Sequence, residues 1–321
     1  MRRLIPLALV LSFAASAFAE DDVIRRGFKV SDGGTLRLNA DVGSIKVVSG
    51  GTGVAVEITR KADGRRGQER LAEHKIELRQ NGNDVVIEDD LPNDNKWRWT
   101  WSNDYEVQWN IRVPARYNLE LHTSGGSIEL ADIGGTVDAD TSGGSITTGR
   151  LSGNSKLNTS GGSIRIGGGN GTIDARTSGG SIDIGETTGR VEARSSGGSI
   201  KIGRSGGEVI AKTSGGGIRI EGAAGAVDAD TSGGSIHASL TRQPTADSRL
   251  HTSGGSVTIV LGRGIGADLD AKASGGGVTS DVPITVQGTM DEDELRGKIN
   301  GGGPKLVVRA SGGGVRVRSG D

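Results

Sequence analysis

The sequence contains no cysteine, which excludes disulfide bonds, thiolate nucleophiles, zinc-thiolate sites and cysteine-linked lipid anchors. Aromatic residues make up only 3% of the chain, too few bulky side chains to fill a thick globular core. Glycine, by contrast, accounts for 57 of the 321 residues. This composition indicates either a thin core or a disordered chain.

Long apolar stretches are absent beyond the first residues. Arg2 and Arg3 precede the apolar run 4–13, and the small residues Ala17 and Ala19 flank Phe18, a pattern typical of a secretory signal peptide. We therefore expect residues 1–19 to be removed on export, to the periplasm or, in a bacterium with one membrane, to the medium. No later stretch approaches the roughly 20 apolar residues of a transmembrane segment.

Neither sign of charge dominates. Removal of residues 1–19 leaves 36 basic and 39 acidic residues, a formal charge of −3. Nucleic-acid-binding domains concentrate positive charge, so we expect no nucleic-acid partner.

The most regular feature is a Gly-Gly pair that recurs every 18 residues. Pairs begin at positions 125, 143, 161, 179, 197, 215 and 233, and then at 254, 275 and 312. The hexapeptide Thr-Ser-Gly-Gly-Ser-Ile surrounds the pair at 141–146, 159–164, 177–182 and 231–236. A disordered glycine tract has no reason to keep such a spacing, so the pattern indicates a structural repeat.

Each glycine pair lies between two short alternations of apolar and polar residues. Val137-Asp138-Ala139-Asp140 precedes one pair, and Ile164-Arg165-Ile166 follows another. A period of two predicts strands, so one repeat is two short strands. Stacking such coils about 4.8 Å apart pairs the strands in parallel and makes one narrow core. The sequence therefore predicts an all-β fold, a parallel β-solenoid (β-helix) of 18-residue coils.

We expect three regions: a signal peptide at 1–19, an N-terminal β region with divergent coils and a Trp-rich strand at 20–115, and a regular solenoid with a C-terminal cap at 116–321. Within the second region, 36–47 resembles a divergent coil and 65–75 a short helix. The glycine spacing loosens to 21 residues around Pro244 and then to 37. Irregular segments at both ends of a solenoid are expected, because exposed ends must be capped.

Two expectations concern the corners. The paired glycines are expected to supply the positive φ of a tight turn. The serine before each pair is expected to form a ladder of hydrogen bonds between coils. These serines are Ser142, Ser160, Ser178, Ser196, Ser214 and Ser232.

Three segments resemble a known family. They are Ile111–Pro114 leading into Leu119–Leu121, the repeated hexapeptide, and Leu295–Pro304 before the last glycine pair. Together they resemble the bacterial putative adhesin family of exported β-solenoid domains, which is related to the head domain of autotransporter adhesins. The resemblance covers roughly residues 30–321. It implies a solenoid, an exported location and an adhesive role, and it supplies no catalytic residues.

Alternating aromatic residues form the first candidate binding site. Trp97, Trp99 and Trp101 share one face of an extended strand, and Tyr105 and Trp109 follow closely. Such a row can form a flat platform for sugar rings or an apolar partner. Alternatively, the aromatic residues cover an end or flank of the solenoid.

A basic stripe is the second candidate. Arg176, Arg194 and Lys212 occupy the same outward position in three consecutive coils, where they could meet phosphate or carboxylate polymers. Asp174 and Glu192 lie two residues earlier on the same face and are expected to neutralise much of the stripe. The alternative is an ordinary solvated face.

Metal, cofactor and catalytic sites are not predicted. Calcium-binding solenoids use a Gly-Gly-x-Gly-x-Asp corner, which this repeat lacks. The four histidines include His122 and His251 at positions where other coils have Asp, Asn, Arg or Lys, so no serine has a dedicated base.

We therefore interpret the protein as a non-enzymatic, exported, adhesin-like scaffold whose partner is an envelope polymer, glycan or protein. One alternative is a carbohydrate-active enzyme, a polysaccharide lyase or hydrolase, with Asp94, Asp104 or Asp247 in its loops. Another is a self-assembling structural protein of the envelope.

Overall fold

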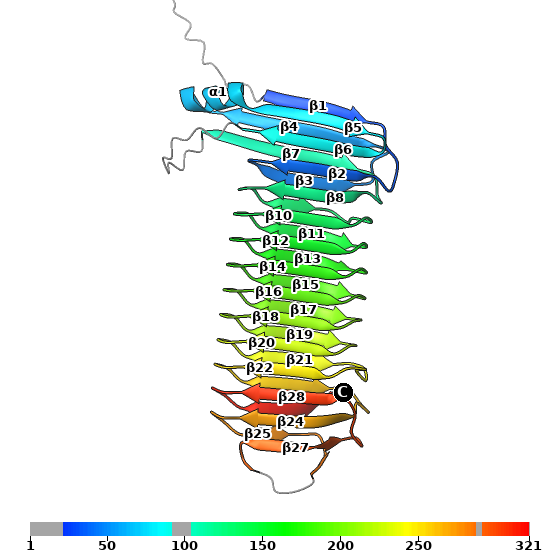
Figure 1. Ribbon diagram of the computed structural model, residues 1–321, viewed down its shortest axis with the longest axis vertical. Coiled ribbons are helices and arrows are strands. Elements are labelled where there is room, and N and C mark those ends of the chain that lie inside the picture. Colours follow the sequence, from blue (N-terminus) through cyan, green and yellow to red (C-terminus); the bar gives the residue numbers. More distant parts are fainter. Residues whose placement is uncertain (1–21, 92–103, 287–290, 321) are drawn as a thin grey trace, which may run out of the picture.

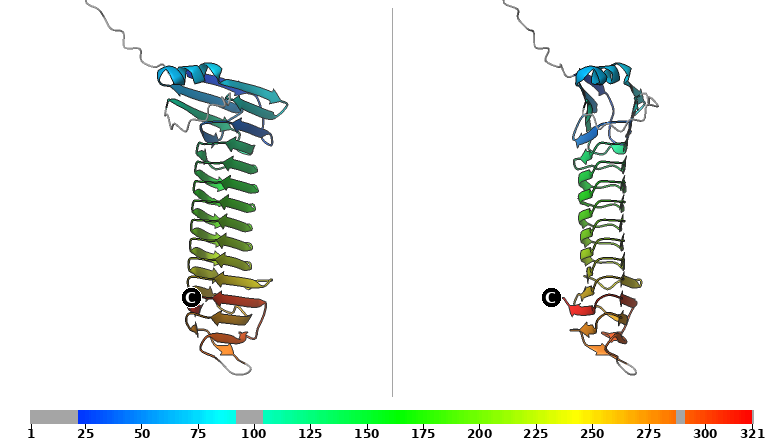
Figure 2. Two further views of the ribbon diagram at one scale, coloured as in Figure 1. Left: turned by 60° about the vertical axis from the view of Figure 1, so that its left-hand side comes forward. Right: turned by 90° about the vertical axis from the view of Figure 1, so that its left-hand side faces the viewer.

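The computed structural model describes residues 22–91, 104–286 and 291–320. The expected signal peptide, Trp97, Trp99 and Trp101 lie outside these residues. The chain forms a rod of two sheets stacked face to face (Figures 1 and 2). Within the described residues, sheet A has 14 strands and sheet B has 15.

In the regular array the chain alternates between the sheets. Sheet B contains β8 (Asn118–Thr123), β10 (Val137–Thr141), β12 (Ser155–Thr159), β14 (Ile173–Thr177), β16 (Val191–Ser195), β18 (Val209–Thr213), β20 (Val227–Thr231) and β22 (Ser248–Thr252). Sheet A contains β9 (Ile128–Leu130), β11 (Ile146–Leu151), β13 (Ile164–Gly169), β15 (Ile182–Thr187), β17 (Ile200–Ser205), β19 (Ile218–Ala223), β21 (Ile236–Leu240) and β23 (Val257–Leu261).

The coils stack in parallel, as predicted. Val137 of β10 lies opposite Ser155 of β12, one 18-residue repeat later. Inward positions alternate with outward ones, so Ile182 and Ile184 are buried while Asp183 between them points outward. Small alanines on sheet B let the two sheets pack closely, which explains how a chain with so few aromatic residues fills its core.

The N-terminal end adds antiparallel strands to this array. The divergent coil is confirmed as β2 (Thr35–Ala40) and β3 (Ser44–Ser49), which pair in parallel with β8 and β9. β7 (Tyr105–Val113), β4 (Val54–Ala62) and β1 (Asp22–Phe28) extend sheet A, and β4 is antiparallel to both neighbours. The hairpin of β5 (Lys75–Asn81) and β6 (Asp84–Asp90) extends sheet B.

The predicted short helix is α1 (Gly64–Glu73), which lies across the N-terminal end of the rod (Figure 1). It contacts β4 and β7 of sheet A, while β1 and β5 are the edge strands at this end. In the part of the chain that the structure describes, no helix is long and apolar enough to cross a bilayer.

At the C-terminal end, the coils do not follow the order of the sequence. The last coil, β28 (Lys305–Ala310) and β29 (Val315–Ser319), lies between the β22/β23 coil and the coil of β24 (Ala267–Ala273) and β25 (Val278–Ser280). The irregular end that we expected is therefore an insertion of the last coil between two earlier coils. The glycine spacing did not predict this order. Beyond it, β27 (Glu294–Ile299) pairs antiparallel with β24, and the two-residue β26 (Ile284–Thr285) pairs with β27.

Asp270 connects its own strand, β24, to both neighbouring strands, the inserted β28 and the antiparallel β27. Its carboxylate accepts hydrogen bonds from Arg309 of β28 at 2.6 Å and from Arg296 of β27 at 3.3 Å. Burial raises the pKa of Asp270, but the hydrogen bonds and charges of Arg309 and Arg296 outweigh it, so the pKa lies below its ordinary value.

The glycine pairs are required for a reason other than the one expected. None of them is among the glycines with positive φ, so that expectation is wrong. Instead, the second glycine touches the backbone of the previous coil. A Cβ added to Gly162 would lie 2.1 Å from the carbonyl oxygen of Gly144, whereas one added to Gly161 would lie 3.3 Å from that of Gly143. Close approach of backbones, not turn geometry, is the constraint.

The glycine contact predicts a position-specific loss of stability. We expect Gly162→Ala to lower the free energy of unfolding by about 1–3 kcal/mol, because its methyl group forces neighbouring coils apart. Gly161→Ala is the matched control, with a smaller expected loss. Urea unfolding followed by far-UV circular dichroism measures both, and equal losses would contradict the close-approach explanation.

The Asp270 contacts predict a pH-dependent loss. A carboxyl whose pKa is lowered on folding stabilises the fold above its unfolded pKa, about 3.9, and loses this effect as the pH falls through the folded pKa. We expect Asp270→Asn to speed amide exchange in β24 and β28 at pH 7. The difference from the wild type should shrink below about pH 4. A difference of constant size down to pH 3 would show that ionisation of Asp270 is irrelevant.

Candidate functional site

A groove of about 430 Å³ runs along sheet B where its strands meet the Thr-Ser-Gly-Gly corners. It spans six coils, from β10 to β20. One wall consists of Asp140, Asn158, Arg176, Arg194, Lys212 and Asp230. The other wall consists of the corner serines Ser160, Ser178, Ser196, Ser214 and Ser232.

The parallel register brings the three predicted cations into one line. Arg176 lies opposite Arg194, which lies opposite Lys212, so their backbones are separated by about 4.8 Å per coil. Their side chains are 48%, 40% and 42% exposed. They are therefore accessible to a partner in the groove.

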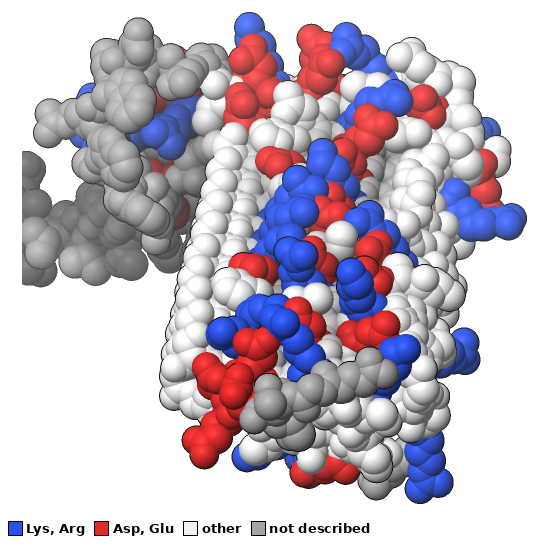
Figure 3. Space-filling view, turned by 60° about the horizontal axis from the view of Figure 1, so that its bottom comes forward, with Lys and Arg blue, Asp and Glu red and all other residues white. Residues whose placement is uncertain are grey.

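Carboxylates on the same face of sheet B neutralise much of this charge, as expected for Arg176 and Arg194. Arg176 contacts Asp174 at 2.8 Å and Glu192 at 3.1 Å. Glu192 also pairs with Arg194, and Lys212 contacts Asp228 at 2.8 Å. Figure 3 shows the resulting band, in which Lys and Arg alternate with Asp and Glu beside a margin of uncharged residues. The face therefore presents many oriented polar groups without a strong field of one sign.

Buried threonines form the floor of the groove and hold the corners together. The Thr177 hydroxyl donates to the carbonyl of Gly162 in the previous coil at 2.7 Å. It also accepts from the N–H of Gly180 in its own corner at 3.2 Å. Equivalent bonds to the previous coil's glycine carbonyl recur at Thr141, Thr159, Ser195, Thr213, Thr231 and Thr252.

The serine ladder exists, but at a different serine from the one expected. The N–H of Ser181 donates to Ser163 Oγ at 3.1 Å, and Ser199 bonds Ser181 in the same way at 3.2 Å. These serines follow the glycine pair. Ser178, which precedes it, is exposed, and its hydroxyl has no hydrogen bond within the described residues. The expectation was wrong because this first serine lines the groove instead of lying over the preceding coil.

Trp109 does not contribute to a surface platform. Its side chain is fully buried, and its Nε1 donates to the carbonyl of Val42 at 3.0 Å. The alternation along β7 turns it inward between Val107 and Ile111. Trp97, Trp99 and Trp101 lie outside the described residues.

Tyr105 belongs to a polar cluster that the sequence analysis missed. Its hydroxyl bonds His74 Nδ1, and His74 Nε2 bonds the buried carboxylate of Asp89. Burial raises the pKa of Tyr105 to about 12, against the opposing influence of Arg60. The cluster joins the end of α1 to both sheets.

One feature of the sequence pointed to this cluster. Val85, Ile87 and Asp89 alternate along β6, so Asp89 shares the inward face of two core residues. A carboxylate at such a position needs a buried partner, which His74 supplies.

No arrangement in the described residues resembles a metal site, since none groups three or more His, Asp or Glu suitably for a metal ion. His122 and His251 contact Asp140 at 3.3 Å and Asp230 at 3.0 Å, near the two ends of the groove. Asp247, a candidate acid of the enzyme alternative, accepts from the backbone N–H of Lys305 at 2.9 Å. Its carboxylate therefore holds the inserted strand.

The family described as Toastrack DUF4097 matches residues 37–318, which include both the groove and the inserted coil. The chain belongs to this Toastrack family. The match confirms the family resemblance seen in the repeat. No curated relative matches the Toastrack chain.

Solved structures similar to the Toastrack chain share little of its sequence. A putative adhesin from Bacteroides fragilis is 14% identical, with a TM-score of 0.35, and the match covers 94% of this chain and 98% of that one. A putative lipid binding protein from Parabacteroides distasonis is 13% identical, with a TM-score of 0.39 and coverages of 92% and 96%. A putative cell adhesion protein from Clostridium sporogenes is 11% identical, with a TM-score of 0.24 and coverages of 94% and 100%.

The groove floor predicts unequal roles for adjacent hydroxyls in the Toastrack repeat. We expect Thr177→Val to lower the free energy of unfolding by about 1–3 kcal/mol, because Gly162 and Gly180 lose a buried hydrogen-bond partner. Ser178→Ala should change it by less than about 0.5 kcal/mol. Urea titration of both variants measures the difference, and a larger loss for Ser178→Ala would reverse the assignment.

Proposed function

We propose that this Toastrack protein is a non-enzymatic, exported, adhesin-like scaffold that binds an envelope polymer, glycan or protein through the faces of its solenoid. The observation that supports it is the groove, in which hydroxyls recur at the spacing of the coils over six consecutive coils and cations over the three central ones. Equivalent hydroxyls recur from coil to coil, so the surface suits an extended or repetitive partner.

The chemistry of the groove suits many weak contacts in place of one strong one. Arg176 and Arg194 form ion pairs with Asp174 and Glu192, which neutralise much of their positive charge. Each of these coils therefore attracts an anion only weakly. Their polar groups are held in place by these ion pairs and by the sheet, which reduces the entropy lost on binding. Repetition along a linear partner then adds these contacts together.

Export is part of the proposal and rests on the pattern in residues 1–19. The lack of cysteine is compatible with this location, because backbone and threonine contacts between coils take the structural place of disulfides. The periplasm is the expected location in a bacterium with two membranes, and the medium in a bacterium with one.

The two alternatives draw less support from the described residues. For a polysaccharide lyase or hydrolase, Asp247 is committed to the backbone of Lys305, Asp94 lies outside the described residues, and Asp104 is only half-buried in a turn before β7. For self-assembly, α1 lies across one end of the rod, and the edge strands at the other end, β25 and β26, are only three and two residues long. Short or covered edges discourage stacking of rods end to end.

The test compares two triple variants of the protein lacking residues 1–19. Arg176→Gln, Arg194→Gln and Lys212→Gln change the groove. Arg165→Gln, Lys201→Gln and Arg219→Gln remove the same charge from the equivalent outward row of sheet A. We expect the groove variant to lose at least tenfold affinity for isolated cell-envelope fractions and the sheet A variant to keep it.

Circular dichroism checks that both triple variants remain folded. Equal losses in the two variants would point to non-specific charge attraction. Absence of binding by the wild type to cell-wall fractions, glycan arrays and envelope proteins would remove the support for an adhesin-like role, and turnover of a polysaccharide would favour the enzyme alternative.

A further inference from the structure

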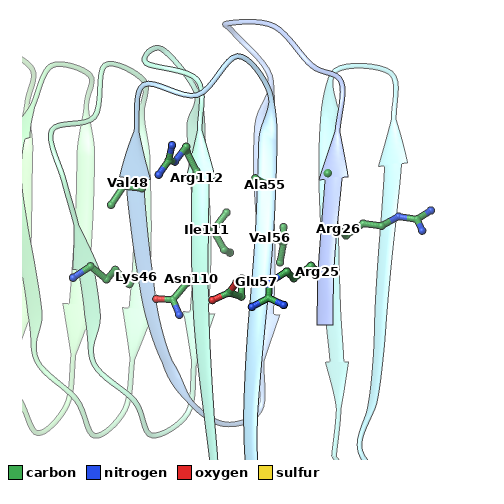
Figure 4. Close-up of a pocket in the computed structure, with 11 residues that line it drawn as sticks. Arg25, Arg26, Lys46, Val48, Ala55, Val56, Glu57, Asn110, Ile111 and Arg112 are labelled. Carbon is green, nitrogen blue, oxygen red and sulfur yellow. Dashed lines mark hydrogen bonds and ion pairs between the residues drawn. The ribbon is translucent and has the colours of Figure 1, made fainter. Parts of the chain in front are cut away.

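A second hollow, of about 580 Å³, lies on the outer face of sheet A near the N-terminal end. It crosses four neighbouring strands, β1, β4, β7 and β3 (Figure 4). It is on the sheet opposite the groove and shares no residue with it. The two surfaces can therefore be changed independently.

The register of the strands arranges the hollow as two adjacent rows. The first row reads Gly27, Ala55, Arg112 and Val48 across the four strands. The second row reads Arg25, Glu57, Asn110 and Lys46. Figure 4 shows Lys46, Asn110, Glu57 and Arg25 in a line, with Val48, Arg112 and Ala55 beside them. One row is mostly small or apolar, and the other is polar.

The floor of the hollow is low over Gly27 and Ala55, because their side chains are absent or short. Gly27 and Ala55 are exposed, and a Cβ added to Gly27 would meet nothing within 4 Å. Val48 is half-buried at the other side of Arg112. A flat C–H surface of a ligand can therefore rest on this row between longer side chains.

Arg112 and Arg26 give the hollow an excess of positive charge, and of the two only Arg26 extends away from the other lining residues (Figure 4). Arg25 is paired with Glu57 at 2.6 Å, and Lys46 with Glu129 at 3.1 Å. Within the described residues, Arg112 has no ion pair or side-chain hydrogen bond, although it is exposed. Its planar guanidinium can bind a carboxylate by donating two parallel hydrogen bonds to the carboxylate oxygens.

We propose that this hollow binds an acidic sugar residue, with the sugar carboxylate on Arg112. The C–H face of the ring lies over Gly27 and Ala55, on the two strands that follow that of Arg112 in the sheet, and the ring hydroxyls meet Asn110 and Glu57. A bare inorganic anion would leave the apolar row unused, and a neutral or purely apolar ligand would leave Arg112 unpaired. An acidic sugar has a group for each part of the hollow: a carboxylate for Arg112, a C–H face for the small apolar residues, and hydroxyls for the polar row. The inference goes beyond the proposed groove function, since it concerns a separate site.

The test titrates the protein lacking residues 1–19 with a galacturonate oligosaccharide in a calorimeter. A neutral galactose oligosaccharide of equal length and inorganic phosphate are the comparison ligands. We expect saturable binding of the galacturonate, at least tenfold tighter than that of either comparison ligand. Equal affinity for the neutral sugar, or binding of phosphate alone, would overturn the assignment to an acidic sugar.

Four variants locate the binding. Arg112→Gln should weaken it at least tenfold, and Arg112→Lys should weaken it less. Ala55→Leu fills the hollow without changing its charge and should also weaken binding at least tenfold. Arg165→Gln removes an exposed arginine from the outward face of β13 and should leave affinity unchanged.

Equal losses in Arg112→Gln and Arg165→Gln would overturn the inference, because they would show that only the general charge of sheet A matters. An Ala55→Leu variant that binds like the wild type, while circular dichroism shows it folded, would overturn it too. The groove residues are intact in all four variants, so binding to envelope fractions through the groove should persist. Failure of one site is therefore distinguishable from failure of the other.

Discussion

Contact between the backbones of consecutive coils is the constraint on which the rest of this structure depends. In the regular coils the second glycine lies against the carbonyl of its counterpart one coil earlier, and a buried threonine or serine donates to that same carbonyl. A side chain at the glycine would separate the coils and lengthen both the ladder bonds and the threonine bond. The Thr-x-Gly-Gly pattern is therefore a packing requirement, repeated because every rung rests on the one before it.

This constraint also shapes the surfaces. Because inward positions and corners are occupied by structural residues, the charged side chains lie at outward positions, which the register arranges in straight rows. The groove on sheet B is one product of this arrangement, with the corner serines on one wall and the row of Arg176, Arg194 and Lys212 on the other. The hollow on sheet A differs, since it lies where antiparallel strands interrupt the repeat and place Arg112 beside small residues.

Contacts within a short repeated pattern were predictable from the sequence. Contacts between segments that are distant in the sequence were not. The neutralisation of Arg176 by Asp174 was predictable, because both lie on one face of one strand two residues apart. The burial of Trp109 against Val42 and the contact of His74 with Asp89 were not, because each joins structural elements that are separate in the sequence. The ladder was assigned to the wrong serine because periodicity does not distinguish the two serines of one corner.

The sequence by itself determined the coil, its 18-residue length, its two strands and the parallel stacking, because each of these follows from a periodic pattern of glycine and apolar residues. Only the tertiary structure decided how the rod ends. The glycine pair at 312 predicts a last coil, but it does not predict which coils lie next to that coil in the stack. Insertion of β28 between β22 and β24 depends on pairing across long intervening segments, and any coil with the same inward pattern satisfies the same ladder.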